Sequence, residues 1–218
     1  MVDRLQENET VRDLLVVDLD GTLLRTNSFS RFVVWFAMRS IRRGRWRDFY
    51  GIASQVVSRK MRCQTHAETK RHIMELSSDS LSEADFVAFA HTLRRWIRVK
   101  VTDLIRSHMA RGGEVLMATA APAEYAAPLA AITGIESLIA SERSACGGEY
   151  RECKGEEKLR RVRGFCAARG MRIAAVITDH YDDLPLMKCS DRVVLVSPSR
   201  KTLLRIRQEN LSSAISVL

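Results

Sequence analysis

Two short stretches of this chain place aspartates directly after an apolar run. The first, "VVDLDGTLL", contains Asp18 and Asp20. The second, "TDHYDDLPLM", contains Asp179, Asp182 and Asp183. Carboxylates that converge on one point cannot all stay ionised unless a cation offsets their repulsion. Oxygen ligands of this kind suit Mg²⁺, whose coordination is usually completed by waters and a substrate phosphate. If the two stretches meet in the fold, they predict a magnesium phosphate site.

The same residue types can transfer a phosphoryl group. A carboxylate can attack phosphorus directly and form an aspartyl-phosphate intermediate. A second carboxyl group, held neutral, can protonate the leaving oxygen and later deprotonate the attacking water. A hydroxyl and an ammonium can then stabilise the remaining phosphoryl oxygens. Thr119, at the end of "EVLMAT", and Lys154, in "CKGEEK", supply these two groups.

Two other interpretations of the first stretch are weaker. Asp20-Gly21 between apolar runs could be a hairpin turn, because this pair readily takes positive φ. The D-x-D spacing could also begin a calcium loop, which needs glycine at position six and an acid at position twelve. Counted from Asp18, glycine falls at position four and Phe29 at twelve, so the calcium loop fails. The hairpin leaves the second acidic cluster unexplained, and we favour the catalytic interpretation.

Four apolar runs predict the strands that would position these residues: 13–18, 114–119, 172–178 and 192–196. The first run is unbroken rather than alternating, which suits a strand covered on both faces. Helical stretches lie between the later strands, near 122–132, 154–169 and 183–189. This alternation predicts an α/β fold, with a Rossmann-like parallel sheet flanked by helices. Ligands of such a sheet bind outside the carboxyl ends of its strands.

Residues 27–110 interrupt the alternation, because they contain no convincing strand and no proline. The last helix of this interval is predicted to run unbroken from Ser82, with Asp85 in its first turn, to Gly112-Gly113. An insertion this long forms a structural unit rather than a loop. The sequence therefore predicts a catalytic core of residues 1–26 and 111–218 and an all-helical cap of residues 27–110.

The motifs "DLDGTLL", "MATAAP", "CKGEEK" and "TDHYDDLPLM" resemble, in this order, the four motifs of the haloacid dehalogenase superfamily. The first and fourth motifs are quite specific, whereas the single threonine and lysine gain their meaning from the order. The resemblance extends from about residue 13 to residue 198, with the helical insertion where the family's cap lies. "CKGEEK" and "DDLPLM" look most like the branch that contains phosphoserine phosphatases and related phosphatases with a helical cap.

The resemblance implies a role for each matched residue. Asp18 would be the nucleophile and Asp20 the general acid/base. Thr119 would hydrogen-bond the phosphoryl group, and Lys154 would neutralise both that group and the nucleophile. The implied ligands of Mg²⁺ are the Asp18 carboxylate, the Asp20 backbone carbonyl, Asp179 and, through water, Asp183. Asp182 stands where relatives often carry asparagine, and we leave it out of the metal's ligands.

Three further residues bear on the site. Lys158, one helical turn after Lys154, could replace it as the phosphate lysine, although a solvent-exposed position is at least as well expected. His180 could shuttle a proton, but a lone loop histidine is more often a packing or surface residue. Asn27 stands where phosphoserine phosphatases carry a glutamate that binds the substrate's amino group. An uncharged side chain there disfavours phosphoserine as the substrate.

Composition limits the partners. The chain has 35 Lys and Arg against 26 Asp and Glu, a net charge of +9, with arginines concentrated in residues 39–47. A positive field can serve nucleic acid, an anionic membrane or a phosphorylated small molecule. No recognisable nucleic-acid motif is present, so nucleic acid is not expected. We expect the apolar run "FVVWFAM" (32–38) to pack inside the cap, and docking of the cap onto a membrane surface is the alternative that we do not favour.

The remaining signals concern the compartment. An odd number of cysteines, five, without a C-x-x-C pair is typical of reduced cytosolic thiols, and their spacing does not suit zinc. The polar N-terminal segment has no apolar stretch of a secretory signal. We expect a soluble cytoplasmic protein, and the pattern does not indicate an oligomeric state.

These observations lead to one favoured function and two alternatives. The favoured function is a Mg²⁺-dependent phosphatase that hydrolyses a small phosphomonoester through phosphorylated Asp18. The first alternative is a membrane-associated lipid-phosphate phosphatase that uses the basic apolar cap. The second is a non-catalytic binding protein that has kept the fold, and the intact set of six site residues counts against it.

Overall fold

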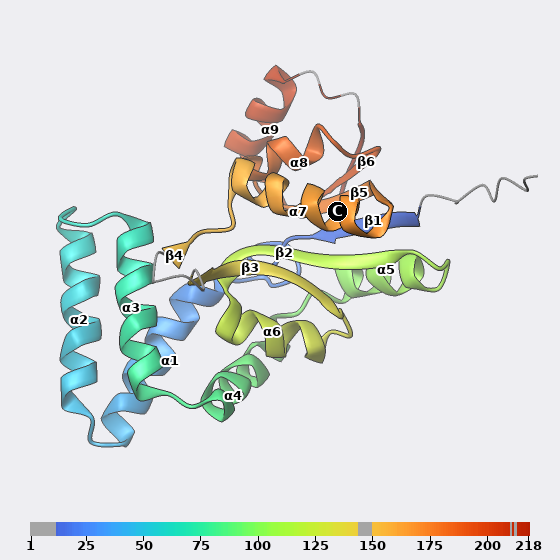
Figure 1. Ribbon diagram of the computed structural model, residues 1–218. Helices are drawn as coiled ribbons and strands as arrows, with labels where there is room; N and C mark the ends of the chain where they lie inside the picture. The colour runs from blue at the N-terminus through green and yellow to red at the C-terminus, as the bar shows by residue number, and fades with distance from the viewer. Residues whose placement is uncertain (1–11, 144–149, 210, 212) are drawn as a thin grey trace, which may run out of the picture.

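The computed structural model describes residues 12–143, 150–209, 211 and 213–218 (Figure 1). Its described strands form one sheet in the order β4-β3-β2-β1-β5-β6-β7. Neighbouring strands run parallel except β3 and β4, which are antiparallel. The strands are β1 (Arg12–Val17), β2 (Glu114–Pro122), β3 (Ser137–Arg143), β4 (Tyr150–Arg151), β5 (Met171–Thr178), β6 (Arg192–Leu195) and β7 (Ala214–Val217). The predicted α/β fold with a parallel sheet is confirmed.

The four predicted strands correspond to β1, β2, β5 and β6, which lie next to one another in the middle of the sheet. The strands β3, β4 and β7 are additional to the prediction and lie towards the two edges. Two features that the sequence predictions used, the polar N-terminal segment and Cys146, lie outside the described residues.

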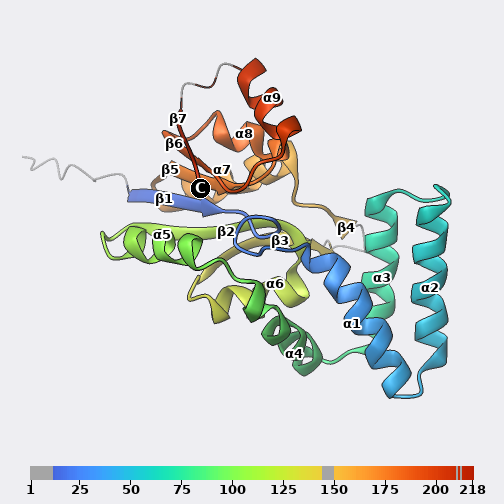
Figure 2. The same ribbon diagram turned by 180° about the vertical axis from the view of Figure 1, so that it is seen from behind.

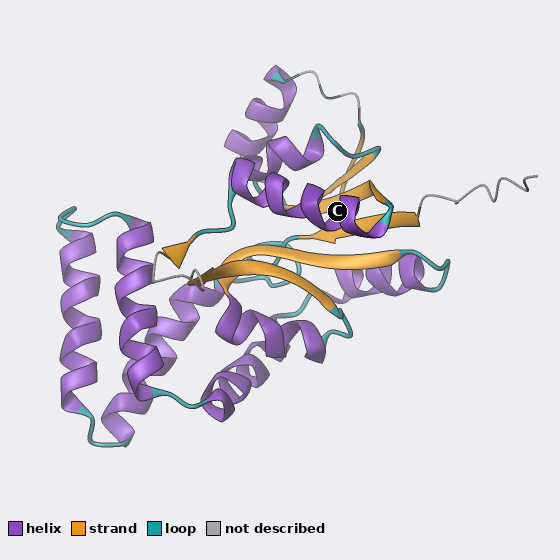
Figure 3. Cartoon of the chain, in the orientation of Figure 1, coloured by secondary structure: helices purple, strands orange, loops and turns teal. Residues whose placement is uncertain are grey.

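The unbroken apolar run of β1 is explained by burial on both faces of the sheet. Leu14 and Val16 belong to a hydrophobic cluster with helix α7 (Gly155–Arg169). Leu15 and Val17 belong to a second cluster on the opposite face, with α5 (Val99–Met109) and α6 (Ala123–Ile132). Alternate residues of a strand point to opposite faces, so a strand buried on both sides needs apolar residues at every position. The remaining core helices, α8 (Leu184–Met187) and α9 (Arg200–Gln208), lie on the α7 side (Figure 3).

The interval between β1 and β2 is helical, as predicted. It contains α1 (Ser28–Arg42), α2 (Trp46–Lys60), α3 (His66–Ser80), α4 (Glu83–Leu93), a short 3-10 helix (Arg94–Trp96) and α5. Seen from behind, α1, α2 and α3 stand clear of the sheet, whereas α5 runs alongside it (Figure 2). No helix in the described part of the chain has both the length and the hydropathy of a bilayer-spanning segment.

The prediction of one unbroken helix from Ser82 to Gly112 is wrong. The helix ends at Leu93, and a new one begins at Val99. Between them the chain pairs with the segment after β1: the N–H of Arg25 donates to the carbonyl of Trp96, and the N–H of Arg98 donates to that of Leu23, both at 2.9 Å. An unbroken helix would need the same backbone groups for its own hydrogen bonds.

The break between α4 and α5 bears on where the cap ends and the core begins. The second half of the interrupted helix, α5, contributes Val101 and Ile105 to the cluster that covers the sheet. Helix α4 packs against α6, which also covers the sheet. We therefore propose that α1, α2 and α3 form the cap proper, and that α4 and α5 belong with the core.

The apolar run 32–38 on α1 is only partly buried, which corrects the expectation that it packs inside the cap. Phe32 and Phe36 are fully buried, and Phe32 lies 5.3 Å from the ring of Tyr125 on α6. These contacts fasten α1 to the core. On the other side of the helix, Val34 is 56% exposed and Met38 is 47% exposed.

The buried carboxylate of Asp85 joins the start of α4 to the end of α1. It ion-pairs with Arg39 and Arg43 and accepts a hydrogen bond from the backbone N–H of Ser82, which caps α4 as predicted. Burial alone would raise the pKa of Asp85, but these hydrogen bonds outweigh it and lower the pKa to about 2. The charged carboxylate therefore stabilises the folded state.

Asp85→Asn is expected to lower the free energy of unfolding by about 2 kcal/mol at neutral pH, because one pKa unit corresponds to about 1.4 kcal/mol. The folded-state pKa lies below the usual value of 3.8, so the loss should disappear as the pH falls from that value towards 2. Urea denaturation at several pH values measures it. The exposed Asp103→Asn, which breaks a surface pair with Arg106, is the control and should have little effect. A difference between Asp85→Asn and wild type that persists at the lowest pH would contradict the assigned charge.

Candidate active site

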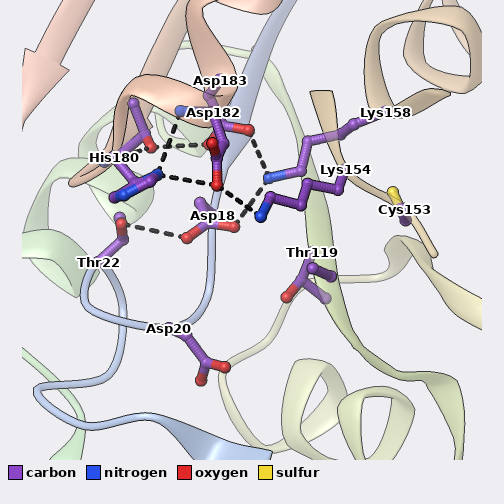
Figure 4. Close-up of polar contacts among 12 residues, drawn as sticks. Asp18, Asp20, Thr22, Thr119, Cys153, Lys154, Lys158, His180, Asp182 and Asp183 are labelled. Carbon is purple, nitrogen blue, oxygen red and sulfur yellow. Dashed lines mark hydrogen bonds and ion pairs between the residues drawn. The ribbon is translucent and has the colours of Figure 1, made fainter. Parts of the chain in front are cut away.

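The six site residues predicted from the sequence surround one cavity of about 350 Å³ at the carboxyl end of the sheet. They are Asp18, Asp20, Thr119, Lys154, Asp179 and Asp183. The aspartates come from the segments that follow β1 and β5, Thr119 lies in β2, and Lys154 precedes α7. Parallel strands with adjacent carboxyl ends therefore bring together residues that are far apart in the sequence (Figure 4).

Asp18 lines the cavity, and its side chain is 13% exposed. Its backbone N–H donates to the carbonyl of Ile177 in β5, which continues the pairing of β1 by one residue. One carboxylate oxygen accepts from Lys158 Nζ at 2.9 Å, and the other from Thr22 Oγ1 at 3.4 Å. Burial raises the pKa of Asp18 to about 7, and the Lys158 ammonium opposes the rise.

The ammonium that pairs with Asp18 belongs to Lys158 and not to Lys154, and the expectation that Lys158 is solvent-exposed is wrong. Lys158 Nζ lies 2.9 Å from Asp18 and 2.7 Å from Asp183, and the residue is only 3% exposed. Burial disfavours an ammonium, but the two carboxylates outweigh this effect and raise the pKa of Lys158. Its four-residue spacing from Val162 places it on the buried face of α7.

Lys154 lies at the mouth of the cavity, in the residue that precedes α7. Its Nζ is 2.9 Å from Asp182 Oδ2, and about half of its side chain is exposed. The same oxygen of Asp182 is 2.9 Å from His180 Nδ1. Asp182 thus contacts both Lys154 and His180 at the rim of the cavity. The predicted role of Lys154, binding the phosphoryl group, remains a prediction.

Asp20 points to a different set of partners from those of Asp18. Its carboxylate accepts hydrogen bonds from the backbone N–H of Ser28 at 2.7 Å and from Ser28 Oγ at 3.1 Å. The hydroxyl of Tyr125, which is fully buried, lies 3.2 Å from the same Ser28 Oγ. Burial raises the pKa of Asp20 to about 6, and the bonds from Ser28 oppose the rise. Ser28 therefore fixes the orientation of the Asp20 carboxyl group, and Tyr125 contacts Ser28 in turn. Neither residue was identified from the sequence.

Thr22 links Asp18 to Asp179. Its hydroxyl lies 3.2 Å from Asp179 Oδ1 and 3.4 Å from Asp18 Oδ2, so the two carboxylates lie side by side. Burial raises the pKa of Asp179. The backbone approaches it as well, because a Cβ on Gly21, whose φ is +79°, would lie 2.1 Å from Asp179 Oδ2. Only glycine fits this position.

This arrangement suits Mg²⁺, which keeps several water ligands, better than a metal that is coordinated entirely by protein side chains. Among the described residues, no three His, Cys, Asp or Glu side chains converge as metal ligands. Asp18 and Asp179 offer two adjacent carboxylates, and Mg²⁺ typically binds one or two carboxylates while water and substrate phosphate complete its shell. Asp183 is committed elsewhere, because one oxygen pairs with Lys158 and the other accepts from Thr178 Oγ1 at 2.7 Å. Its support of the metal through water remains a prediction.

Thr119 lines the cavity near the end of β2 and is 1% exposed. Its Oγ1 accepts a hydrogen bond from the N–H of Ala121 at 3.0 Å. This bond fixes the oxygen and leaves the hydroxyl proton free to donate. The hydroxyl can therefore donate to an acceptor in the cavity, as the sequence predicts for a phosphoryl oxygen.

The cap supplies part of the cavity wall, with Phe29, His66 and Lys70. Phe29 and His66 meet edge to face, with ring centroids 5.8 Å apart. Lys70 is buried, donates to the carbonyl of Ala120 at 3.0 Å and ion-pairs with Glu152 from the core. This pair fastens α3 to the core beside the cavity. Except for Asn27, none of the cap residues in this wall was identified from the sequence.

Asn27 has a structural role that its sequence position did not indicate. Its side-chain oxygen accepts from the N–H of Ser30 at 2.8 Å and caps the N-terminus of α1. The oxygen is therefore occupied by the helix, although the residue lines the cavity.

The sheet thus carries carboxylate, hydroxyl and ammonium side chains around one cavity at its carboxyl edge. The family model for haloacid dehalogenase-like hydrolases matches residues 15–188, and the chain belongs to this family. Among curated proteins, it is 26% identical over 187 residues to Protein CicA of Caulobacter vibrioides, covering 82% of this chain and 83% of that protein.

Solved structures share the fold. One is a protein of unknown function from Bordetella pertussis Tohama I, with a TM-score of 0.73 and 23% identity, covering 95% of this chain and 99% of that one. Another is a phospho-aspartyl intermediate analogue of phosphoserine phosphatase, with a TM-score of 0.62 and 11% identity, covering 95% of this chain and 93% of that one. Together with the family match, these structures confirm the predicted resemblance to phosphoserine-phosphatase-like members of the superfamily.

Proposed function

We propose that this protein is a Mg²⁺-dependent phosphatase that hydrolyses a small phosphomonoester through a phosphorylated Asp18. The observation that carries the proposal is the setting of Asp18, whose carboxylate is held between Lys158 and Thr22 at the wall of the cavity. A carboxylate fixed in this way can approach phosphorus from one side with its charge partly balanced. The phosphoserine phosphatase whose phospho-aspartyl analogue shares this fold supports the same intermediate here.

The reaction follows from the positions of the two aspartates. Asp18 Oδ attacks phosphorus, the bond from phosphorus to the ester oxygen breaks, and the proton of Asp20 passes to the leaving oxygen. Water then attacks the acyl phosphate, Asp20 takes up its proton, and inorganic phosphate leaves as Asp18 is regenerated. The burial that raises the pKa of Asp20 to about 6 helps it to carry the proton that the first step needs.

Other groups balance the charge of the transferred phosphoryl group. Thr119 donates its hydroxyl proton, and Lys158 keeps the nucleophile in place while offsetting its charge. Asp18, Asp179 and the backbone carbonyl of Asp20 would hold Mg²⁺, which supplies charge neutralisation at the phosphoryl oxygens. Lys154 at the rim can contact an incoming phosphate before it is enclosed.

The substrate is a phosphorylated small molecule whose leaving group contacts the cap. Phe29 offers an apolar surface, and the Lys70–Glu152 pair is internally balanced. Asn27 is uncharged, and its oxygen caps α1, so the wall lacks the charge that would bind the ammonium of phosphoserine at that position.

We propose a cytoplasmic location, since the described cysteines Cys63, Cys153, Cys166 and Cys189 are free thiols.

A direct test uses the purified protein with Mg²⁺ and a panel of phosphorylated metabolites. The expected result is release of inorganic phosphate from at least one phosphomonoester. Acid quenching during turnover should also leave a phosphoryl group on the peptide that contains Asp18, detected by mass spectrometry. Turnover in which that peptide is never labelled would contradict the covalent route.

Metal removal gives a second test. Chelation should abolish turnover reversibly, and Asp179→Asn should raise the Mg²⁺ concentration needed for half-maximal activity by at least about tenfold, since even outer-shell partners of a metal contribute 10–100-fold. Asp182→Asn is the matched control, because Asp182 binds Lys154 and His180 at the rim, and its Mg²⁺ requirement should be unchanged. Turnover that survives thorough chelation would show that the reaction does not need the metal.

A further inference from the structure

The net positive charge of the chain comes entirely from one segment. Residues 21–67 contain ten of the 35 lysines and arginines and one of the 26 acids, so the rest of the chain carries 25 of each. The single acid, Asp48, is buried and pairs with Arg45. This segment includes α1 and α2, two of the three cap helices that stand clear of the sheet (Figure 2).

An apolar stripe runs along the outer face of α2. Trp46, Tyr50, Val57 and Met61 follow one another at intervals of four, seven and four residues, which is the spacing of a single helix face. Their exposed fractions are 53%, 66%, 54% and 71%. Ile52, on the opposite face of α2, is 2% exposed and packs into the core cluster. The stripe therefore lies on the face of α2 that points away from the rest of the protein.

The stripe is accompanied by exposed basic side chains. Arg47 lies beside its first residue, and Arg59, Lys60 and Arg62 surround its last. The last residue, Met61, is five positions from His66, which lines the active-site cavity. The basic apolar surface formed by α2 and the turn after it is thus joined by a short stretch of chain to a residue that lines the cavity.

We propose that this surface of α2 docks onto an anionic lipid surface. Helices with a Trp-containing apolar face and flanking Lys and Arg lie in the plane of the membrane interface and are attracted by anionic headgroups. A second copy of the chain fits poorly, because each copy would bring the same net charge of +9 to the contact. Nucleic acid could use the arginines and stack on Trp46 and Tyr50, but the aliphatic half of the stripe, Val57 and Met61, offers it neither a stacking surface nor a hydrogen bond, whereas a lipid surface can cover the whole stripe.

Cosedimentation of the full-length protein with vesicles tests the proposal. The protein should sediment with vesicles of equal parts phosphatidylglycerol and phosphatidylcholine at low salt, less so as salt rises, and not with phosphatidylcholine alone. Arg47→Glu with Lys60→Glu should weaken the partition by at least about tenfold, as expected for removing and reversing charges near an anionic surface. Tyr50→Ser with Val57→Ser should weaken it as well, because both side chains would lose their place in the interface.

Matched variants on α9 separate docking from a general effect of charge. Arg205→Glu with Arg207→Glu makes the same change of charge, and Leu204→Ser removes an apolar side chain that is 58% exposed. Both should bind like wild type. All variants should turn over a soluble phosphomonoester at the wild-type rate without vesicles, so failure of docking is distinguishable from failure of the proposed phosphatase activity.

Three outcomes would overturn the proposal. The first is a wild-type protein that anionic vesicles do not retain at low salt. The second is equal loss of binding in the α2 and α9 variants. The third is vesicle binding that Tyr50→Ser with Val57→Ser leaves intact, because the surface would then be purely electrostatic. Binding of a DNA duplex by that variant, with no vesicle binding by the wild type, would identify nucleic acid as the occupant instead.

Discussion

Asp18→Asn is expected to reduce turnover of a phosphomonoester by roughly 10⁴-fold or more, the scale seen when an enzyme loses its nucleophile. The amide keeps the shape of the side chain but lacks the charge with which Asp18 Oδ attacks phosphorus. The fold should persist, because Lys158 keeps its 2.7 Å ion pair with Asp183. The variant also removes a carboxylate whose charged form burial disfavours, as its raised pKa indicates.

Steady-state kinetics and the acid-quench experiment measure this effect together. The variant should show neither turnover nor a phosphorylated peptide, while its unfolding transition remains close to that of the wild type. Asp191→Asn, on the surface and paired with Arg172, is the control and should keep wild-type turnover. Near-normal activity of Asp18→Asn would refute the covalent mechanism, whatever the substrate.

The positions of the candidate catalytic aspartates could be predicted from the sequence because they depend on local rules. An unbroken apolar run such as Leu14–Val17 marks a strand buried on both faces, and the carboxyl ends of parallel strands share one edge. Once β1, β2 and β5 are recognised, Asp18, Thr119 and Asp179 must lie near one another. The order of the motifs along the chain then indicates the family to which the protein belongs.

Features that depend on contacts between distant segments could not be predicted. The break between α4 and α5 is caused by pairing of residues 96–98 with residues 23–25, which no local pattern of the helix indicates. The Lys70–Glu152 pair joins α3 to the segment after β4 and depends on how the cap lies over the core. The residues with which the cap lines the cavity, and which would contact the leaving group of a substrate, could therefore be identified only from the structure.

The choice between Lys154 and Lys158 falls between these cases. The family motif alone favours the first lysine of "CKGEEK", but the phase of α7 favours the second. Lys158, Val162 and Cys166 lie four residues apart, and all three are buried. A lysine on the apolar stripe of a helix must meet a carboxylate inside the protein. Helical periodicity applied to this segment would have identified Lys158 as the buried partner of the nucleophile.

This difference leads to the second large expected effect. Lys158→Met keeps the length and apolar stem of the side chain but leaves Asp18 and Asp183 in a buried site without their ammonium. Turnover should fall by about 10²–10³-fold, the scale for loss of one preorganised electrostatic partner. Lys154→Met should have a smaller effect that appears mainly in KM, because Lys154 is half-exposed and bound to Asp182 at the rim. Measuring kcat and KM for both variants distinguishes the two lysines.

The pH dependence of stability gives the same test a readout that does not depend on the substrate. Without Lys158, the pKa of Asp18 should rise further above its usual value of 3.8, because the ammonium opposes the rise in the wild type. A carboxyl group whose folded-state pKa is raised binds its proton more tightly when folded, so stability falls as the pH rises through that range. Lys158→Met should therefore be most destabilised at neutral to alkaline pH and recover as the pH is lowered and the Asp18 carboxyl group becomes protonated. The Lys154→Met profile should follow that of the wild type. If Lys154→Met instead lost most of its kcat while Lys158→Met kept wild-type turnover, Lys154 would be the lysine that serves the nucleophile, as the motif alone suggests.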